Sequence, residues 1–244
     1  MSTRKRDVTE NNRKTFVIFL TTFVFAIGAA VAFIALSSQQ SLGEPGAATE
    51  GLHQERLEDG GFILGDPDAP ITIVAFEDFL CPHCQQYEST LKQIIEEYVA
   101  TGQARFEYRM FTIVNPTFSP LSAQLVECAE ELQPGSFWEA HDVMFNITSS
   151  SNFAANGARR FAQEMGLNYS DLLACTEDAN QYQVDSELAN QLGATGTPSV
   201  FVRYKTEDGL SDPQWIEFGG QTFNRGGVPY DVLSFVIQEA NARD

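Results

Sequence analysis

The hydrophobic pattern divides the chain into segments of different character. Residues 16–36 form an uncharged apolar run, and residues 37–60 are polar and rich in Gly, Ser, Gln and Glu. A helix needs about 20 apolar residues to cross a bilayer, and the first run meets that length. Signal peptides have shorter apolar regions, of about 7–15 residues, so an uncleaved membrane anchor is favoured over a cleaved signal, which stays the alternative.

The charges ahead of this run predict its orientation. The basic side chains near the N-terminus are Arg4, Lys5, Arg6, Arg13 and Lys14. Basic residues before an apolar span keep the N-terminus in the cytoplasm. We therefore expect a cytoplasmic tail over residues 1–14, a transmembrane helix or signal segment over 15–37 and a flexible tether over 38–60. The chain from residue 61 onward is then extracytoplasmic, at the cell membrane.

Shorter apolar stretches predict the strands of an α/β domain. Residues 71–76 are apolar on both faces, which is typical of a buried central strand. Further strands are predicted at 62–64, 105–111, 199–204 and 215–218. Gly219 and Gly220 are expected to end the sheet, because adjacent glycines interrupt strands.

Helical spacing of apolar side chains dominates the rest of the chain. Residues 85–98 and 228–240 each predict a helix that belongs with the strands. Between them, helical runs follow one another without a strand, at 121–129, 137–145, 158–165, 170–176 and 184–192. The pattern predicts one domain over residues 61–244, with an all-helical insertion over about 115–191.

The net charge narrows the choice of partners. The formal net charge is −18 at neutral pH, and nucleic-acid phosphates would repel such a chain. We therefore expect no nucleic-acid partner.

The candidate chemistry lies directly after the central strand, where Cys81 and Cys84 stand three positions apart. A predicted helix follows them, so Cys81 lies at a helix N-terminus, where the backbone N–H groups and the helix dipole favour an anion. This predicts a thiolate at Cys81, the form that attacks disulfides. Pro82 fits the first helical turn without losing a hydrogen bond.

Two other uses of paired cysteines fit the sequence less well. A structural zinc site needs two more ligands, and the histidines (His53, His83 and His141) show no metal-binding spacing. A c-type haem attachment site needs His directly after the second cysteine, where this chain has Gln85. Redox chemistry is the interpretation that remains, and we expect neither a metal nor another cofactor.

Three segments together resemble the DsbA-like thiol:disulfide oxidoreductases of the thioredoxin superfamily. They are Gly65-Asp66-Pro67-Asp68-Ala69-Pro70, Cys81-Pro82-His83-Cys84 and Gly196-Thr197-Pro198-Ser199-Val200-Phe201-Val202. The resemblance covers residues 61–244 and implies an α/β thioredoxin fold with a helical insertion, preceded here by the predicted N-terminal transmembrane helix. It also implies a cis bond between Thr197 and Pro198, packed against the redox disulfide.

The residues of the motif can be given expected roles. Cys81 is the sulfur that is attacked in the oxidised protein, Cys84 closes the disulfide, and the His83 imidazole is expected to stabilise the Cys81 anion. A substrate segment is expected to bind at Pro82, Thr197 and Pro198. We predict an oxidase that acts on exported proteins with free thiols and is reoxidised by a membrane partner. A reductase or isomerase, and a non-catalytic peptide-binding chaperone, remain alternatives.

The sequence departs from the family at one position. Related proteins usually carry a buried acid six positions before the first cysteine, and this chain has Ala75 there. Glu77 and Asp78 lie nearer to the motif and could replace that acid. We expect them instead to be solvated loop carboxylates.

The two remaining cysteines, Cys128 and Cys175, both lie in the predicted insertion. Exported proteins rarely leave thiols free, so a structural disulfide between them is expected. The alternative is a second redox pair, although neither the spacing nor a basic neighbour favours a low pKa there.

Overall fold

The computed structural model describes residues 46, 48–150, 153 and 156–243. The predicted cytoplasmic tail and apolar span lie outside the described residues. Within the described residues, no helix is both long enough and apolar enough to cross a membrane.

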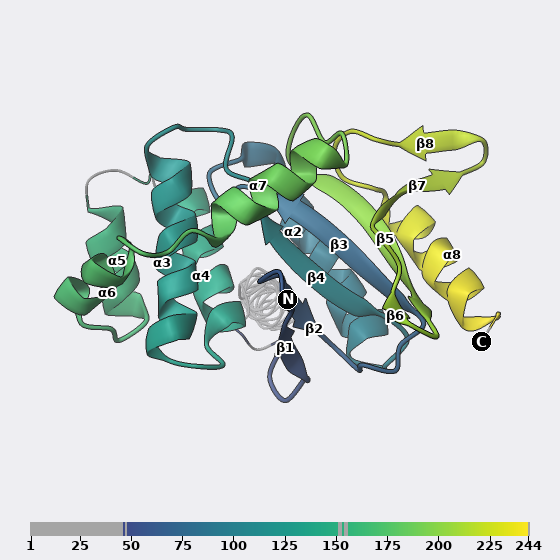
Figure 1. Ribbon diagram of the computed structural model, residues 1–244, viewed down its shortest axis with the longest axis horizontal. Helices are drawn as coiled ribbons and strands as arrows, with labels where there is room; N and C mark the ends of the chain where they lie inside the picture. The colour runs from purple at the N-terminus through teal and green to yellow at the C-terminus, as the bar shows by residue number, and fades with distance from the viewer. Residues whose placement is uncertain (1–45, 47, 151–152, 154–155, 244) are drawn as a thin grey trace, which may run out of the picture. The chain divides into compact units, whose positions relative to one another are not determined.

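The sheet is built around β3 (Ile71–Glu77), whose seven residues are all buried. On one side β3 pairs in parallel with β4 (Arg105–Met110), and on the other it pairs antiparallel with β5 (Ser199–Thr206). The strand order is β1-β2-β4-β3-β5-β7-β8, with β6 paired to β5 (Figure 1). The outer strands are β1 (Gln54–Arg56), β2 (Phe62–Leu64), β6 (Gly209–Leu210), β7 (Gln214–Phe218) and β8 (Gln221–Phe223).

Two predictions about the edges of this sheet are wrong. Residues 54–56, assigned to the tether, form β1 and pair with β2, because an exposed edge strand needs only backbone partners. Gly219 and Gly220 do not end the sheet. They take positive φ angles of 60° and 78° and form the turn between β7 and β8, a conformation that glycine adopts without strain.

Two helical segments accompany the sheet. The predicted helix after the cysteines is α2 (Pro82–Ile94), and it continues as the short π-helical segment η1 (Ile95–Val99). The closing helix is α8 (Tyr230–Asn241), which packs against α2 and β3. Cys84, Glu88 and Leu91 share the buried face of α2, so this face carries both a redox sulfur and a carboxylate.

The insertion consists of five helices in the described residues. They are α3 (Phe118–Leu132), α4 (Phe137–Ser150), α5 (Gly157–Glu164), α6 (Tyr169–Cys175) and α7 (Gln181–Gln191). Figure 1 shows α3 to α6 gathered beside the sheet, while α7 returns toward β4, which it contacts. A disulfide joins Cys128 of α3 to Cys175 of α6. The insertion predicted from helical spacing therefore occupies the expected place between β4 and β5.

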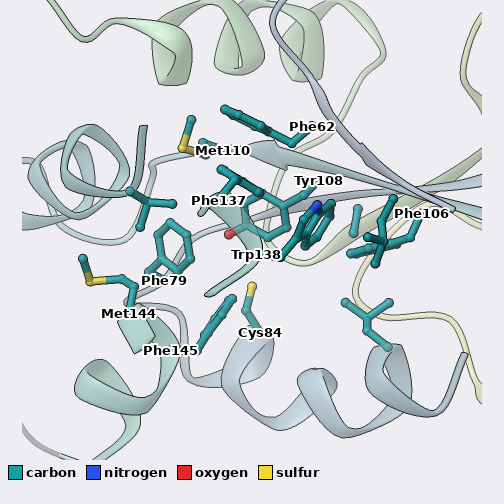
Figure 2. Close-up of a cluster of buried hydrophobic side chains, with 14 of the residues drawn as sticks. Phe62, Phe79, Cys84, Phe106, Tyr108, Met110, Phe137, Trp138, Met144 and Phe145 are labelled. Carbon is teal, nitrogen blue, oxygen red and sulfur yellow. The ribbon is translucent and has the colours of Figure 1, made fainter. Parts of the chain in front are cut away.

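One continuous core joins the insertion to the sheet (Figure 2). Aromatic side chains of α4 meet those of the strands: Phe137 stacks on Phe62 with ring centroids 3.5 Å apart. The His141 ring packs edge-on against Tyr108 at 4.6 Å. Offset and edge-on contacts of this kind add to the free energy of hydrophobic burial. The insertion is thus fixed against the face of the sheet that carries the active-site helix.

The opposite face of β4 is charged and also buried. Arg109 is fully covered, and its guanidinium donates to Glu107 at 2.6 Å, to Asp185 of α7 at 3.0 Å and to Asp59 at 2.8 Å. Burial works against ionisation of Asp59, but its bonds to Arg109 outweigh that effect and lower its pKa. These ion pairs, called the Arg109 cluster below, tie α7 and the β1–β2 connection to the sheet.

Candidate active site

The turn between β3 and α2 is held by Asp78, which is buried. Its carboxylate accepts hydrogen bonds from the backbone N–H groups of Leu80 at 2.9 Å, Ile113 at 2.9 Å and Val114 at 2.8 Å. The N–H of Cys81 donates to the Asp78 carbonyl oxygen at 2.9 Å. The expectation of a solvated Asp78 is therefore wrong, because the loop at residues 113–114 folds over the turn and buries the carboxylate.

Cys81 is the N-cap residue of α2, with Pro82 next to it in the first turn. Its Sγ lies 3.3 Å from the carbonyl oxygen of Thr197, and the Thr197–Pro198 bond is cis. The thiol of Cys84 makes the largest contribution to lowering the pKa of Cys81 to about 5, with further contributions from Thr197 and the N–H groups of His83 and Cys84. Cys81 is therefore a thiolate at neutral pH.

Cys84 has the opposite character. Figure 2 shows its sulfur directed from α2 toward the aromatic cluster that includes Tyr108 and Trp138. Its side chain is fully buried. Burial raises its pKa, and the neighbouring Cys81 and Glu77 raise it further. The two sulfurs thus differ in the way that disulfide exchange requires: one is a stable anion and the other holds its proton.

A groove of about 490 Å³ runs beside the cis bond. It is lined by His83, Gln86, Tyr87, Thr90, Gly196, Thr197, Pro198, Arg225, Gly226 and Gly227. The Tyr87 hydroxyl donates a hydrogen bond to the carbonyl oxygen of Val228 at 2.8 Å, which holds the segment at residues 225–228 against α2. A Cβ at Gly227 would lie 2.4 Å from the Tyr87 ring, so only glycine fits there.

The groove brings together three of the residues predicted from the sequence. His83, Thr197 and Pro198 all line it, whereas Pro82 is exposed in the first turn of α2 and does not. The contribution of His83 to the Cys81 anion comes from its backbone N–H, while its side chain is exposed. A larger hollow, of about 630 Å³, is lined by charged residues of β1, β4 and β5 and contains neither Cys81 nor Cys84.

Glu77 is also buried, contrary to the expectation of a solvated loop carboxylate. It is the last residue of β3, and the turn and α2 cover it completely. Neither carboxylate oxygen has a hydrogen-bond partner in the described part of the chain. Burial raises its pKa well above the ordinary value, and the charges of Glu88 and Cys81 raise it further, although Cys84 partly offsets this. Ala75, where relatives usually carry an acid, is buried in the core.

Sequence reasoning missed two residues of this site, Glu88 and His141. Both are buried, and their polar side-chain atoms lie with those of Glu77 within 4.8 Å of one another. The position of Glu88 could have been found, because it lies four residues after Cys84 and so on the same helix face. The position of His141 has no such local signal, and its ring packs among the aromatic rings of the core.

The remaining cysteines are separate from this chemistry. Cys128 and Cys175 are bonded to each other, with their Cα atoms 5.9 Å apart, while Cys81 and Cys84 are free thiols. The disulfide joins two helices of the insertion, which is the place of a structural cross-link.

Comparisons with known proteins agree with this geometry. A family model described as thioredoxin matches residues 58–216. Disulfide bond formation protein D of Bacillus subtilis is 25% identical over 162 residues, which cover 62% of this chain and 71% of that protein. The Na(+)/H(+) antiporter NhaA 3 of Salinispora tropica is 28% identical over 154 residues, and the match spans 62% of this chain but only 23% of the antiporter.

A solved structure adds the fold. The crystal structure of α-DsbA1 from Wolbachia pipientis aligns with a TM-score of 0.57 and 25% identity, over 74% of this chain and 90% of that one. The family model covers well over half of the sequence, and it includes both cysteines of the motif and the cis proline. The chain therefore belongs to the thioredoxin family, among its DsbA-like thiol:disulfide oxidoreductases.

Proposed function

We propose that the protein is an extracytoplasmic oxidase, which introduces disulfides into exported proteins through Cys81 and Cys84. The observation that supports this direction is the difference between the two sulfurs. The pKa of Cys81 is lowered to about 5, and a thiol of low pKa is a good leaving group in disulfide exchange. Stabilising the reduced form of the pair in this way makes the disulfide form a strong oxidant.

The reaction proceeds in two exchanges. A substrate thiolate attacks Sγ of Cys81 in the Cys81–Cys84 disulfide, the enzyme's S–S bond breaks, and Cys84 departs and takes up a proton. A second substrate thiolate then attacks the substrate sulfur of the mixed disulfide, and Cys81 leaves as a thiolate. The substrate loses two electrons and gains a disulfide, and the enzyme's cysteine pair is reduced.

The groove beside the cis bond supports binding of an extended substrate segment. The Thr197 carbonyl contacts Cys81 in the reduced protein. This carbonyl lies beside the sulfur that a substrate attacks, so it is placed to accept a hydrogen bond from the backbone of a bound substrate segment. Pairing through the backbone accepts many sequences, which suits an enzyme that acts on many exported proteins.

Turnover requires an oxidant, because each reaction leaves the cysteine pair reduced. We propose that a membrane protein accepts these electrons, and that residues 16–36 anchor the enzyme beside it. This proposal rests on the length of the uncharged run and the basic residues before it. A single-span anchor would place the catalytic domain outside the cytoplasm, where disulfides persist.

The reduction potential of the Cys81–Cys84 pair, measured against glutathione with the full chain in detergent, tests the oxidase proposal. We expect a value nearer to the about −120 mV of DsbA than to the about −270 mV of thioredoxin. A value as reducing as that of thioredoxin would make the protein a reductase. A Cys81→Ser variant that still prevents aggregation of an unfolded protein as well as the wild type would favour a chaperone.

A further inference from the structure

We propose that a row of buried side chains carries protons between Cys84 and the protein surface. The row consists of Glu77, Glu88 and His141 and ends at Asp142 and Lys92. This inference rests on the disulfide exchange proposed above, because Cys84 must gain a proton when its disulfide is reduced and lose it when the disulfide forms again.

The middle of the row is formed by three buried residues from three elements. The polar side-chain atoms of Glu77, Glu88 and His141 lie within 4.8 Å of one another, and His141 Nε2 is 4.0 Å from Glu88 Oε1. These distances are longer than a hydrogen bond of about 2.7–3.2 Å, so the relay requires the carboxyl groups to rotate toward one another during turnover. The row crosses from the end of β3 through α2 to α4 of the insertion.

The outer end of the row reaches solvent. His141 Nδ1 lies 3.3 Å from Asp142 Oδ1, and Lys92 Nζ lies 3.4 Å from the same oxygen. The Lys92 side chain is 37% exposed, whereas that of His141 is only 5% exposed. Asp142 also accepts a hydrogen bond from the N–H of Gly46 at 3.0 Å. Protons can therefore enter and leave at Asp142 and Lys92.

The inner end of the row lies against the buried sulfur. Glu88 follows Cys84 by one helical turn on the buried face of α2. Glu77 lies beside them at the end of β3 and interacts with Cys84 strongly enough for each to shift the pKa of the other. The proton that reaches this sulfur can therefore come directly from a buried carboxyl group.

The hydrogen bonding of the row separates it from an ordinary structural cluster. Within the described ranges, both oxygens of Glu77, Oε1 of Glu88 and Nε2 of His141 have no hydrogen-bond partner other than one another and Cys84. Each residue is at least nine-tenths buried. Buried polar atoms of native proteins are nearly always paired, and exceptions call for an explanation. Proton exchange among these groups during each turnover would explain why they are not paired with other side chains.

The proposed step conserves atoms and charge. When a substrate thiolate breaks the Cys81–Cys84 bond, Cys84 departs with the bonding electrons, and the proton of the Glu77 carboxyl moves to its sulfur. Glu77 is reprotonated from Glu88, and Glu88 is reprotonated through His141 from the surface. The same transfers run backwards when the disulfide forms again. Burial raises the pKa of both carboxyl groups, which favours the protonated form that the relay needs.

Other ionisable groups border the row. Tyr108 of β4 packs its ring against His141, and its hydroxyl is buried without a partner in the described part of the chain. Burial raises the pKa of Tyr108 well above its ordinary value, so this hydroxyl stays neutral. The carboxylate of Asp78 is engaged with backbone N–H groups, and Cys81 faces Thr197.

The test is single-turnover reduction of the oxidised full chain by a small thiol, stopped with acid and followed by alkylation of Cys84. We expect Glu88→Gln to slow this reduction at least tenfold at neutral pH and to change its pH profile and solvent deuterium isotope effect, while the pKa of Cys81 stays unchanged. Glu96→Gln is the matched control, because Glu96 lies two turns further along the same helical segment and is exposed.

Equal rates, pH profiles and isotope effects for Glu88→Gln and wild type would overturn the relay. So would tight binding of Co²⁺ to the reduced wild type that is lost in Glu88→Gln, because the row would then be a cation site. The glutathione potential is measured separately, so failure of the oxidase proposal and failure of the relay are distinguishable. Lys92→Met, at the exposed end, is expected to slow the reduction a few-fold, and an unchanged rate would place the proton exit elsewhere and contradict the row as proposed.

Discussion

Two groups of buried ionisable side chains differ in how well their members are paired. The Arg109 cluster and the row of Glu77, Glu88 and His141 lie on opposite faces of the same sheet. In the β3–β4 ladder Phe76 is opposite Arg109 and Glu77 is opposite Met110, and successive residues of a strand point to opposite faces. The face toward α7 carries the paired charges, and the face toward α2 carries the unpaired ones.

The paired cluster contributes to the stability of the fold, whereas the unpaired row is suited to chemistry. Each nitrogen of the Arg109 guanidinium has an acidic partner, so the cluster holds α7 and the β1–β2 connection in one position. Glu77, by contrast, has no basic side chain as a partner in the described residues. A carboxyl left unpaired beside a reactive sulfur destabilises the fold and has a pKa suited to proton transfer, as perturbed groups at functional sites commonly do.

The largest expected effect comes from breaking the paired cluster. Arg109→Leu leaves Asp185 buried without a cation and Glu107 with Arg203 alone, and breaking a buried pair in this way costs about 3–5 kcal/mol. Urea denaturation measures the loss. Arg243→Leu is the control, because it removes only an exposed pair with Glu239, worth less than about 1 kcal/mol. Similar losses in the two variants would show that the Arg109 cluster does not hold the insertion.

A smaller effect is expected at the outer end of the row. Burial opposes the ionisation of Asp142, but its hydrogen bond to His141 and the nearby charges outweigh burial and lower its pKa to about 2. A lowered pKa stabilises the fold above the unfolded value of 3.8, and this stability is lost as the pH falls toward 2. The free energy of unfolding of Asp142→Asn should therefore be about 2 kcal/mol lower than that of the wild type near neutral pH, and equal to it at about pH 2. Urea denaturation at the two pH values measures this. Equal losses at all pH values would contradict this.

Glu77→Gln should raise the free energy of unfolding, whereas Asp142→Asn should lower it. The folded pKa of Glu77 lies above the unfolded value of 4.5, so the carboxyl destabilises the fold increasingly as the pH rises past that value. The reduced variant should be more stable than wild type by on the order of 1 kcal/mol at about pH 8, and equal to it at about pH 4. Thermal denaturation at the two pH values measures this. A variant less stable than wild type at the higher pH would mean that Glu77 is paired after all.

The smallest effect is expected at Thr197, whose hydroxyl is also buried without a partner in the described residues. Thr197 contributes to lowering the pKa of Cys81. Thr197→Val keeps the shape of the side chain and removes the hydroxyl, so it should raise the pKa of Cys81 by no more than about one unit. Titration of the reduced variant checks this, and an unchanged pKa would show that the Thr197 hydroxyl does not stabilise the anion.

Much of the fold could be predicted because its signals are local. The central strand predicted at residues 71–76, the cysteines at the start of a helix and the helical spacing over the insertion are all patterns within short segments. The place of Thr197 beside Cys81 came from the family resemblance, because the two residues are 116 positions apart and no short pattern links them.

The burial of the carboxylates could not be predicted in the same way. Glu77 and Asp78 lie where the strand pattern ends, and they are buried by α2 and the loop at residues 113–114, which pack there only in the folded protein. In the sequence Arg109 is one polar position of an alternating strand, and only the folded structure places Asp185 of α7 against it. The edge strand β1 left no apolar signal, because all three of its residues are exposed.

The decisive measurement is the titration of the Cys81 thiolate in the reduced full chain, followed by its ultraviolet absorbance. We expect one transition with a pKa near 5, because Cys84, Thr197 and the helix N-terminus stabilise the anion. Cys84 should show no ionisation in the same range, because it is buried beside Glu77. A single transition near 9.0, the ordinary value for cysteine, would show that the site does not stabilise the Cys81 anion.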